Sequence, residues 1–265
     1  MNKNLLKDLS VALKGELLFD ELSKAIYATD ASVYRKLPTA VAYPKNEEDL
    51  KKLLAFANQN TIGLIPRAAG TSLAGQCVGE GIVVDVSRHF TKIVSLDKDK
   101  KQVTVQPGVV RDELNQYLKP FGLFFGPNTS TSNRCMIGGM VGNNSSGTTS
   151  IQYGVTRDKV LAMRCILSDG NDAFFSSISK KEFEEKKKGD SLEAKIYTKL
   201  FEELSNPEIQ NNIKAEFPKP SIHRRNTGYA VDELLKNNIF GEDETEFNLC
   251  KLLSGSEGTL AFSTE

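Results

Sequence analysis

Apolar and polar positions in the first part of the chain follow helical and strand periods in turn. Leucines spaced by three to five residues between positions 4 and 36 predict a helical N-terminal segment. A short β-prone stretch at 39–44 ends at a proline, and residues 46–60 combine an Asn cap, acidic first-turn residues and an apolar stripe. A strand at 63–66 then enters the small-residue stretch PRAAGTSLAGQ at 66–76. The pattern predicts a fold of mixed helices and strands.

The middle of the chain continues this alternation. Residues 81–108 contain three short apolar stretches separated by turn residues, which predict three strands, and residues 109–119 predict a helix. GLFFGP at 122–127 predicts a further strand. The glycine-, serine- and asparagine-rich tract at 128–154 carries regular apolar positions, so we expect an ordered ligand-binding loop with a short helix. Residues 159–178 predict a hairpin that turns at an Asp-Gly pair.

The last third of the chain changes character twice. Residues 179–220 are dense in Lys and Glu and keep a helical apolar period, which predicts an exposed helical insertion with a solvated charged face. We assign no chemistry to this segment. Residues 221–265 return to short helices, glycine turns and a final strand.

Composition excludes several functional classes. With 34 basic and 34 acidic residues the formal charge is zero, so nothing in the balance favours nucleic acid or an anionic membrane surface. The four cysteines are far apart in sequence and form no C-x-x-C pair, which favours reduced, buried thiols over disulfides or a metal cluster. No segment approaches the roughly 20 apolar residues of a membrane span. We therefore expect a soluble cytoplasmic protein without a metal.

Three clusters of small residues, at 70–75, 138–147 and 255–259, require one explanation. Consecutive backbone N–H groups free of side-chain bulk form concave sites for anions, and Ser or Thr hydroxyls add donors to phosphate oxygens. Neither the P-loop pattern nor a dinucleotide fingerprint after a strand is present. The clusters are therefore either structural turns or the binding loops for a phosphate-bearing cofactor of another kind.

The order of these clusters resembles the FAD-binding domain of the vanillyl-alcohol-oxidase/PCMH superfamily. Within it, the chain is most similar to FAD-linked dehydrogenases of D-2-hydroxy acids such as D-lactate, glycolate and D-2-hydroxyglutarate. Five stretches carry the resemblance: the T-S-x-x-G loop at 66–76, V-Q-P-G-V at 105–109, the I-G-G-M tract at 127–147, N-T-G-Y at 226–229, and G-S-E-G-T-L through T-E at 255–265. The resemblance implies an α+β, PCMH-type fold with two α/β subdomains and FAD between them.

The resemblance extends over residues 37–265 and implies a division of the chain. Residues 1–36 would be a helical leader, 37–178 the FAD-binding core, 179–220 the charged insertion and 221–265 the C-terminal part of the FAD-binding domain. In the family, the catalytic base and most substrate-binding groups come from a cap domain after the T-E motif. We therefore assign no catalytic base. The charged insertion resembles that of large members with a C-terminal iron–sulfur module.

The matched motifs imply a set of cofactor-binding residues. They are Arg67, Ala68, Ala69, Gly70, Thr71, Ser72, Gln76, Pro107, Gly108, Pro127, Thr131, Gly138, Gly139, Asn143, Gly147, Tyr153, Tyr229, Glu257, Gly258 and Thr259. Many relatives have R-G-G-G where this chain has R-A-A-G, so the two alanines restrict the loop to ordinary dihedral angles. The loop has no histidine for covalent attachment, and we interpret Cys135 as a buried core thiol. We therefore expect non-covalent FAD.

The implied reaction is oxidation of a 2-hydroxy acid, with a hydride leaving its α-carbon for flavin N5. The downstream electron acceptor stays open. Two alternatives stay open as well: a non-catalytic interaction module that uses the charged insertion, and the same fold acting on another alcohol, an amine or an enolpyruvyl substrate. His223, Arg224 and Arg225 either bind a substrate carboxylate or the flavin phosphates, or form a solvated positive patch.

Overall fold

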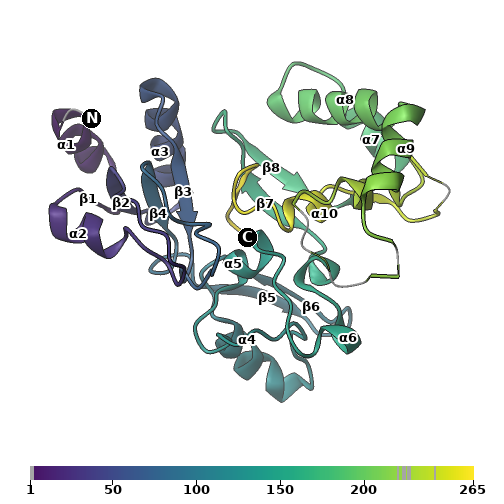
Figure 1. The fold of residues 1–265 in the computed structure, drawn as a ribbon, viewed down its shortest axis with the longest axis horizontal. Helices are drawn as coiled ribbons and strands as arrows, with labels where there is room; N and C mark the ends of the chain where they lie inside the picture. Colours follow the sequence, from purple (N-terminus) through teal and green to yellow (C-terminus); the bar gives the residue numbers. More distant parts are fainter. Residues whose placement is uncertain (1–2, 220, 223–224, 226–227, 242) are drawn as a thin grey trace.

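Short strands and helices alternate along the chain in the computed structural model, which describes residues 3–219, 221–222, 225, 228–241 and 243–265 (Figure 1). The helices are α1 Lys3–Ala12, α2 Glu21–Ile26, α3 Glu47–Asn60, α4 Arg111–Leu118, α5 Ile137–Gly142, α6 Ser150–Tyr153, α7 Lys180–Lys186, α8 Leu192–Leu204, α9 Pro207–Glu216 and α10 Cys250–Leu253, with 3-10 turns η1 Lys119–Phe121, η2 Thr156–Lys159 and η3 Val231–Leu235. The strands are β1 Glu16–Leu18, β2 Ala40–Tyr43, β3 Leu64–Arg67, β4 Ile82–Asp85, β5 Ile93–Asp97, β6 Gln102–Val105, β7 Met163–Ile166, β8 Asp172–Phe175, β9 Ser177–Ile178, β10 Phe247–Asn248 and β11 Phe262–Ser263.

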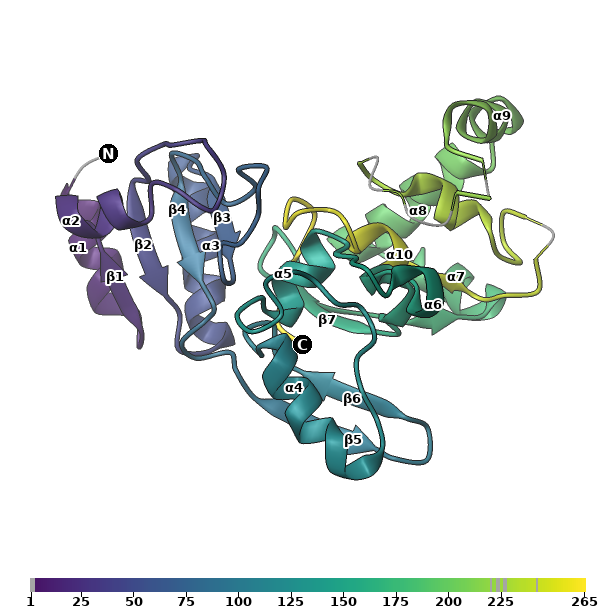
Figure 2. The same cartoon turned by 60° about the horizontal axis from the view of Figure 1, so that its bottom comes forward.

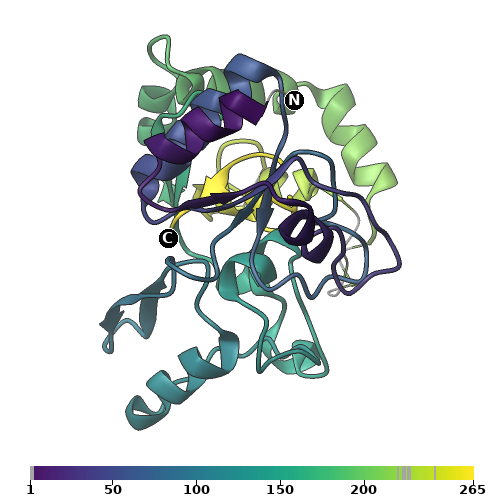
Figure 3. The same ribbon diagram turned by 90° about the vertical axis from the view of Figure 1, so that its left-hand side faces the viewer.

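The N-terminal sheet has the strand order β1-β2-β4-β3. Strands β2, β4 and β3 are parallel, and β2 and β4 are buried along their whole length, which explains their continuous apolar sequences. Helices α1 and α3 pack their leucines on one face of this sheet. Figure 3 shows the two helices lying together over the strands. Loops that follow β3 and β4 leave the sheet at its carboxyl edge.

The helical prediction for residues 4–36 is only partly correct. Helices α1 and α2 are present, but Leu17 lies in β1, which pairs antiparallel with β2 as the sheet's edge strand. The chain turns at Gly15, where an added Cβ would lie 2.0 Å from the Tyr43 carbonyl oxygen. The carboxylate of Asp49 is fully buried and accepts N–H groups of Lys14, Gly15 and Lys45 at 2.8 to 2.9 Å. Strand pairing and this buried carboxylate override the leucine spacing.

A second unit consists of the β5-β6 hairpin and α4, with Val109, Leu114 and Leu118 buried between them. The helix predicted at 109–119 is confirmed as α4 with η1. The strand predicted at 122–127 is wrong, since the structure assigns no strand to these residues. Their backbone bonds to side chains of α4 instead: Phe125 N donates to Asn115 Oδ1 at 2.7 Å.

The third unit is the antiparallel sheet β11-β7-β8 with the short β9-β10 ladder beside it. The predicted hairpin between β7 and β8 is confirmed. The segment 179–220 is helical as predicted, forming α7, α8 and α9. It is not only a solvated surface, because Phe183 and Tyr197 are fully buried against Phe247 in the core of this unit.

The four cysteines are buried and unpaired. Burial raises the pKa of both Cys165 and Cys250 to about 12, so they stay protonated at neutral pH. Within the described ranges, no group of His, Cys, Asp and Glu is arranged to hold a metal ion. Among the helices that the structure describes, none has the length and apolar character needed to cross a bilayer.

Figure 2 shows α5 near the point where the three units meet.

Candidate functional site

The loop at 67–76 begins at the carboxyl end of β3 and is half-buried over most of its length. Its two glycines, Gly70 and Gly75, have φ angles of +64° and +72°, which other residues rarely adopt. The N–H of Ala74 donates to Ser72 Oγ at 3.1 Å. From Ala68 to Leu73, by contrast, the backbone N–H groups find no acceptor anywhere in the described part of the chain. Six adjacent free donors in a glycine-bearing loop provide the hydrogen-bonding capacity of an anion nest.

Helix α5 lies against this loop and against the Pro-Gly-Val turn. Gly138 N donates to the Pro107 carbonyl at 2.8 Å, and a Cβ on Gly138 would lie 2.4 Å from the Pro107 Cβ. Gly108 N donates in turn to the Phe90 carbonyl at 2.7 Å. A Cβ on Gly139 would lie 3.2 Å from the Ala68 Cβ. The second and third sequence motifs therefore meet the first at the start of α5.

Gln76 joins three loops through its side-chain amide. Its Nε2 donates to Asn143 Oδ1 at 3.0 Å and to Glu257 Oε1 at 2.6 Å, while its Oε1 accepts from the Ser72 hydroxyl. Gln76 thus links the 67–76 loop to the end of α5 and to the 255–259 turn. We call this group of four side chains the Gln76 clasp.

The turn at 255–259 contacts both α5 and the start of the 67–76 loop, in addition to its hydrogen bond in the clasp. Glu257 N donates to the Gly142 carbonyl at 2.9 Å, and Glu257 has a φ of +56°. A Cβ on Gly258 would lie 3.0 Å from Pro66 Cγ, at the entrance to the first loop. Residues more than 180 positions apart in sequence are therefore in contact.

Arg157 supports this turn and was not singled out from the sequence. Its side chain is buried, and its Nη2 and Nε donate to the carbonyls of Ser254 at 2.6 Å and Lys251 at 2.9 Å. Its N–H donates to Asn144 Oδ1 at 2.9 Å. Burial lowers the pKa of Arg157 from its ordinary value. A single Arg in GVTRDKV carries no local pattern, so its only sequence signal is its position just after the Tyr153-Gly154 pair.

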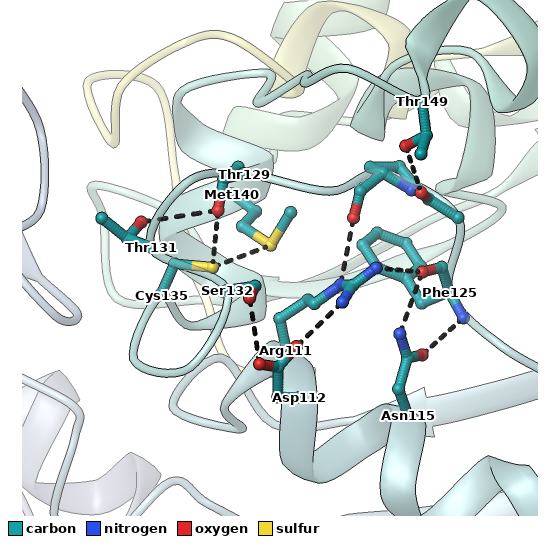
Figure 4. A network of polar contacts seen from close by, with 12 residues as sticks. Arg111, Asp112, Asn115, Phe125, Thr129, Thr131, Ser132, Cys135, Met140 and Thr149 are labelled. Carbon is teal, nitrogen blue, oxygen red and sulfur yellow. Dashed lines mark hydrogen bonds and ion pairs between the residues drawn. The ribbon is translucent and has the colours of Figure 1, made fainter.

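The segment 123–135 is held by α4 (Figure 4). The Arg111 guanidinium donates to the carbonyls of Pro127 and Phe125, both at 3.2 Å, and Ser132 Oγ donates to Asp112 Oδ2 at 2.9 Å. The Arg111 hydrogen bond holds the pKa of the Asp112 carboxyl below its usual range. Buried Pro127 is thus fixed by side chains from another element.

The same close-up shows a small cluster of hydroxyl and sulfur groups (Figure 4). Thr131 Oγ1 lies 3.4 Å from Thr129 Oγ1, which is 3.2 Å from Cys135 Sγ. Cys135 Sγ is 3.6 Å from Met140 Sδ and is buried. Cys135 is thus a core thiol, as interpreted from the sequence.

Two further predicted residues have packing roles in the structure. Gly147 admits no side chain, because an added Cβ would lie 1.4 Å from the Asn128 carbonyl oxygen. Tyr153 packs edge-on against Phe124 with ring centroids 5.1 Å apart. Both residues hold the 123–135 segment against the end of the glycine-rich tract.

Not every predicted residue joins the central group. The Tyr229 hydroxyl lies 2.6 Å from Thr259 Oγ1, which donates to the Ser256 carbonyl at 2.6 Å. Arg225 forms ion pairs with Asp232 and, at 2.9 Å, with Glu233, so the predicted positive residue is already neutralised by acids. Residues 223–224 and 226–227 lie outside the described residues, and their predicted roles stay predictions.

The arrangement fits the diphosphate of a dinucleotide. The 67–76 loop supplies free N–H groups and the Thr71 hydroxyl and contains no acidic residue, while the Ser72 hydroxyl already donates to Gln76 Oε1. Close-packed glycines let α5 and the 255–259 turn approach the 67–76 loop. The Gln76 amide donates a hydrogen bond to the Glu257 carboxylate. Adjacent N–H donors in a loop without an acidic residue favour a phosphate group.

Comparisons with known proteins agree with this chemistry. The chain is 39% identical over 256 residues to D-2-hydroxyglutarate dehydrogenase of Haemophilus influenzae, covering 95% of this chain and 24% of that protein. It is 38% identical over 241 residues to the enzyme of the same name from Escherichia coli, covering 90% and 23%. It is 31% identical over 169 residues to the glycolate oxidase subunit GlcD of Bacillus subtilis, covering 62% and 36%. The chain thus spans about a quarter of the length of the two dehydrogenases.

Solved structures share the fold at low sequence identity. An alkyldihydroxyacetonephosphate synthase matches with a TM-score of 0.58 and 19% identity, over 65% of this chain and 38% of that one. A 6-hydroxy-D-nicotine oxidase from Arthrobacter nicotinovorans matches with 0.55 and 20%, over 64% and 38%. The expected α+β fold is confirmed. Residues 38–171 match the family described as FAD binding domain, and the chain therefore belongs to this family, whose cofactor is FAD.

Proposed function

We propose that the chain is the FAD-binding part of an oxidoreductase that oxidises a 2-hydroxy acid of the lactate, glycolate or 2-hydroxyglutarate type. The single observation that carries the proposal is the run of free N–H groups at 68–73, bordered by α5 and closed by the Gln76 clasp. The names of the relatives, two D-2-hydroxyglutarate dehydrogenases and a glycolate oxidase subunit, support the substrate class.

In this proposal the chain's residues bind and orient the cofactor. The N–H groups of 68–73 with the Thr71 hydroxyl hold the diphosphate, and the Ser72 hydroxyl donates to Gln76 in the clasp. The rest of the cofactor lies beside residues 107–108, 127–147 and 257–259. When bound, FAD supplies an acceptor for the hydride that leaves the α-carbon of the substrate. We infer non-covalent binding, because the 66–76 loop contains no histidine and the Cys135 thiol is buried against Thr129 and Met140.

The proposed flavin-binding part extends over all three units of the fold. Residues 37–178 and 221–265 form the flavin-binding part, and the 179–220 helices are an insertion whose apolar side completes the core of the third unit. We assign the catalytic base and the substrate carboxylate site to no residue of this chain. The buried, unpaired cysteines support a reducing location such as the cytoplasm.

Flavin absorbance tests the proposal directly. When purified protein is mixed with FAD, we expect the flavin absorption bands to shift and to show resolved shoulders. The flavin should also stay with the protein through gel filtration. Folded protein that retains no FAD would remove the flavin-enzyme proposal and favour the interaction-module alternative. A panel of 2-hydroxy acids, other alcohols and amines with an artificial electron acceptor, run on the intact gene product, separates the proposed substrate class from other chemistry on the same fold.

Gly139→Asp tests the location of the cofactor. The new carboxylate would stand beside Ala68 and repel a diphosphate, so we expect FAD affinity to fall by at least about a hundredfold, or about 2.7 kcal/mol. Gly63→Asp is the matched control, because it adds the same charge at an exposed position with open space around it. Unchanged FAD affinity in folded Gly139→Asp protein would mean that the α5 motif is misassigned.

A further inference from the structure

Arg67 ends β3, and its side chain lies against the chain that precedes the sheet. Its Nη1 donates to the Thr29 carbonyl at 2.8 Å, and its guanidinium carbon lies 4.9 Å from the centre of the Tyr27 ring. A Cβ on Gly70 would lie 2.5 Å from Arg67 Nη2. The guanidinium therefore fills the space between the glycine-rich loop and residues 27–31, and the φ of +64° at position 70 favours glycine there.

Residues 27–34 contact the loop at both of its positive-φ glycines. Ala31 N donates to the Gly70 carbonyl at 3.1 Å. A Cβ on Gly75 would lie 2.7 Å from Tyr34 Cδ2. Asp30 contributes a weaker contact, with Oδ2 3.8 Å from Cys77 Sγ. We call residues 27–34 the loop floor.

The loop floor is fixed to the sheet through Tyr27. Its hydroxyl donates to Asp85 Oδ2 at 2.6 Å and lies 2.6 Å from the Tyr43 hydroxyl. Asp85 is buried, pairs in register with Arg67, and accepts Ser87 N at 2.7 Å through its other oxygen. Burial first, and the Asp85 hydrogen bond second, raise the pKa of Tyr27, so the phenol keeps the proton that it donates.

We propose that Arg67 is a positioning residue, which orders the N–H groups of 68–73 for the cofactor by bracing Gly70 against Thr29 and the Tyr27 ring. It does not act as a cation paired with phosphate. This inference rests on the proposed function, since it assumes that the loop binds the FAD diphosphate. It assigns a cofactor-related role to residues 27–34, which precede the matched family region.

A double-mutant cycle measures how far Arg67 and Tyr27 support the loop together; we call this support the brace. Arg67→Met and Tyr27→Leu are each expected to weaken FAD binding about tenfold, and the double variant by no more than about twentyfold, because both changes remove the same support. FAD affinity is read from quenching of flavin fluorescence, with thermal unfolding recorded for every variant. Arg88→Met is the matched control: Arg88 stacks on Tyr43 at 3.6 Å and pairs with Glu16, but it does not contact the loop. We expect its FAD affinity to stay within about twofold of wild type.

The conservative variant separates bracing from charge. Lys keeps the positive charge but lacks the planar guanidinium that stacks on Tyr27 while it donates to Thr29, so Arg67→Lys should weaken FAD binding as Arg67→Met does. The salt dependence of FAD binding should stay unchanged in both variants, because no ion pair to the ligand is lost. Wild-type affinity in Arg67→Lys, together with a reduced salt dependence in Arg67→Met, would overturn the proposal.

Amide hydrogen exchange of the FAD-free protein provides a readout that is independent of cofactor binding. Arg67→Lys and Arg67→Met should speed exchange of the Ala31 and Ala74 amides, which donate to the Gly70 carbonyl and to Ser72 Oγ, and Arg88→Met should not. Unchanged exchange in both Arg67 variants would overturn the brace, whatever the FAD result. Faster exchange in a protein that never binds FAD would retain the brace and reject the proposed function.

Discussion

The loops at 67–76 and 136–147 have similar compositions but use their glycines differently. In the first, Gly70 and Gly75 have positive φ angles, and the N–H groups between Ala68 and Leu73 have no acceptor in the described residues. In the second, Gly138 and Gly147 have ordinary φ angles and are glycines because neighbouring atoms leave no space for a Cβ. The first loop offers hydrogen bonds, and the second offers close packing. Glycine content alone therefore does not identify which loop binds an anion.

The largest expected effect is a loss of stability when the close packing of the second loop is disrupted. Gly147→Ala places a Cβ 1.4 Å from the Asn128 carbonyl oxygen, which forces backbone movement and should lower the free energy of unfolding by more than about 4 kcal/mol. Urea denaturation measures this loss. Gly63→Ala, with no atom within 4 Å of the new Cβ, should stay within about 1 kcal/mol of wild type. Equal stability of the two variants would contradict the packing role.

A smaller effect is expected where the two loops are joined. Gln76→Ala removes the donor to Asn143 and Glu257, so the loops need more ordering when they bind FAD. We expect about tenfold weaker FAD binding with stability within about 1 kcal/mol of wild type, measured by fluorescence titration and denaturation. Gln116→Ala, on the exposed face of α4, is the control. A clasp variant that loses stability but not FAD affinity would make the clasp purely structural.

The smallest expected effect concerns the support that α4 gives to the 123–135 segment, which precedes the second loop. The lowered pKa of Asp112 means that its contribution to stability is present above about pH 4, the unfolded value, and is lost as the pH falls through the folded value. Because the Asp112 side chain is 44% exposed, Asp112→Asn should cost less than about 1 kcal/mol at pH 7. Urea denaturation at pH 7 and pH 3 should show this difference shrinking in acid. A difference that persists unchanged at pH 3 would reject the ionised carboxylate as its source.

Local pattern and turn chemistry were sufficient for part of the fold. The Asn46 cap of α3 and the Asp169-Gly170 turn between β7 and β8 are encoded within a few residues, and both predictions are confirmed. The leucine spacing around Leu17 was misleading, because pairing with β2 decides its conformation. The apolar stretch at 122–127 was misleading for a similar reason, since side chains of α4 take its backbone hydrogen bonds.

The candidate site shows the same limit. The glycine clusters and their order could be found in the sequence, and the structure brings Ala68, Gly139 and Glu257 into one neighbourhood through α5 and the Gln76 clasp. Their contacts with FAD stay a prediction. Arg157 and Tyr27 could not be found, because neither lies in a motif and their partners Lys251 and Asp85 are 94 and 58 positions away. Long-range burial and hydrogen bonding, which give these residues their roles, leave no periodic trace in sequence.

Strand β1 has a practical consequence for anyone who isolates the flavin-binding region. The family match begins at residue 38, whereas β1 covers the edge of β2 from residues 16–18. A chain trimmed to the matched boundary would expose the free N–H and C=O groups of the apolar strand Ala40–Tyr43, an open template for pairing with other molecules. Self-association of such a trimmed protein would then report a missing edge strand, and not a failure of the flavin site itself.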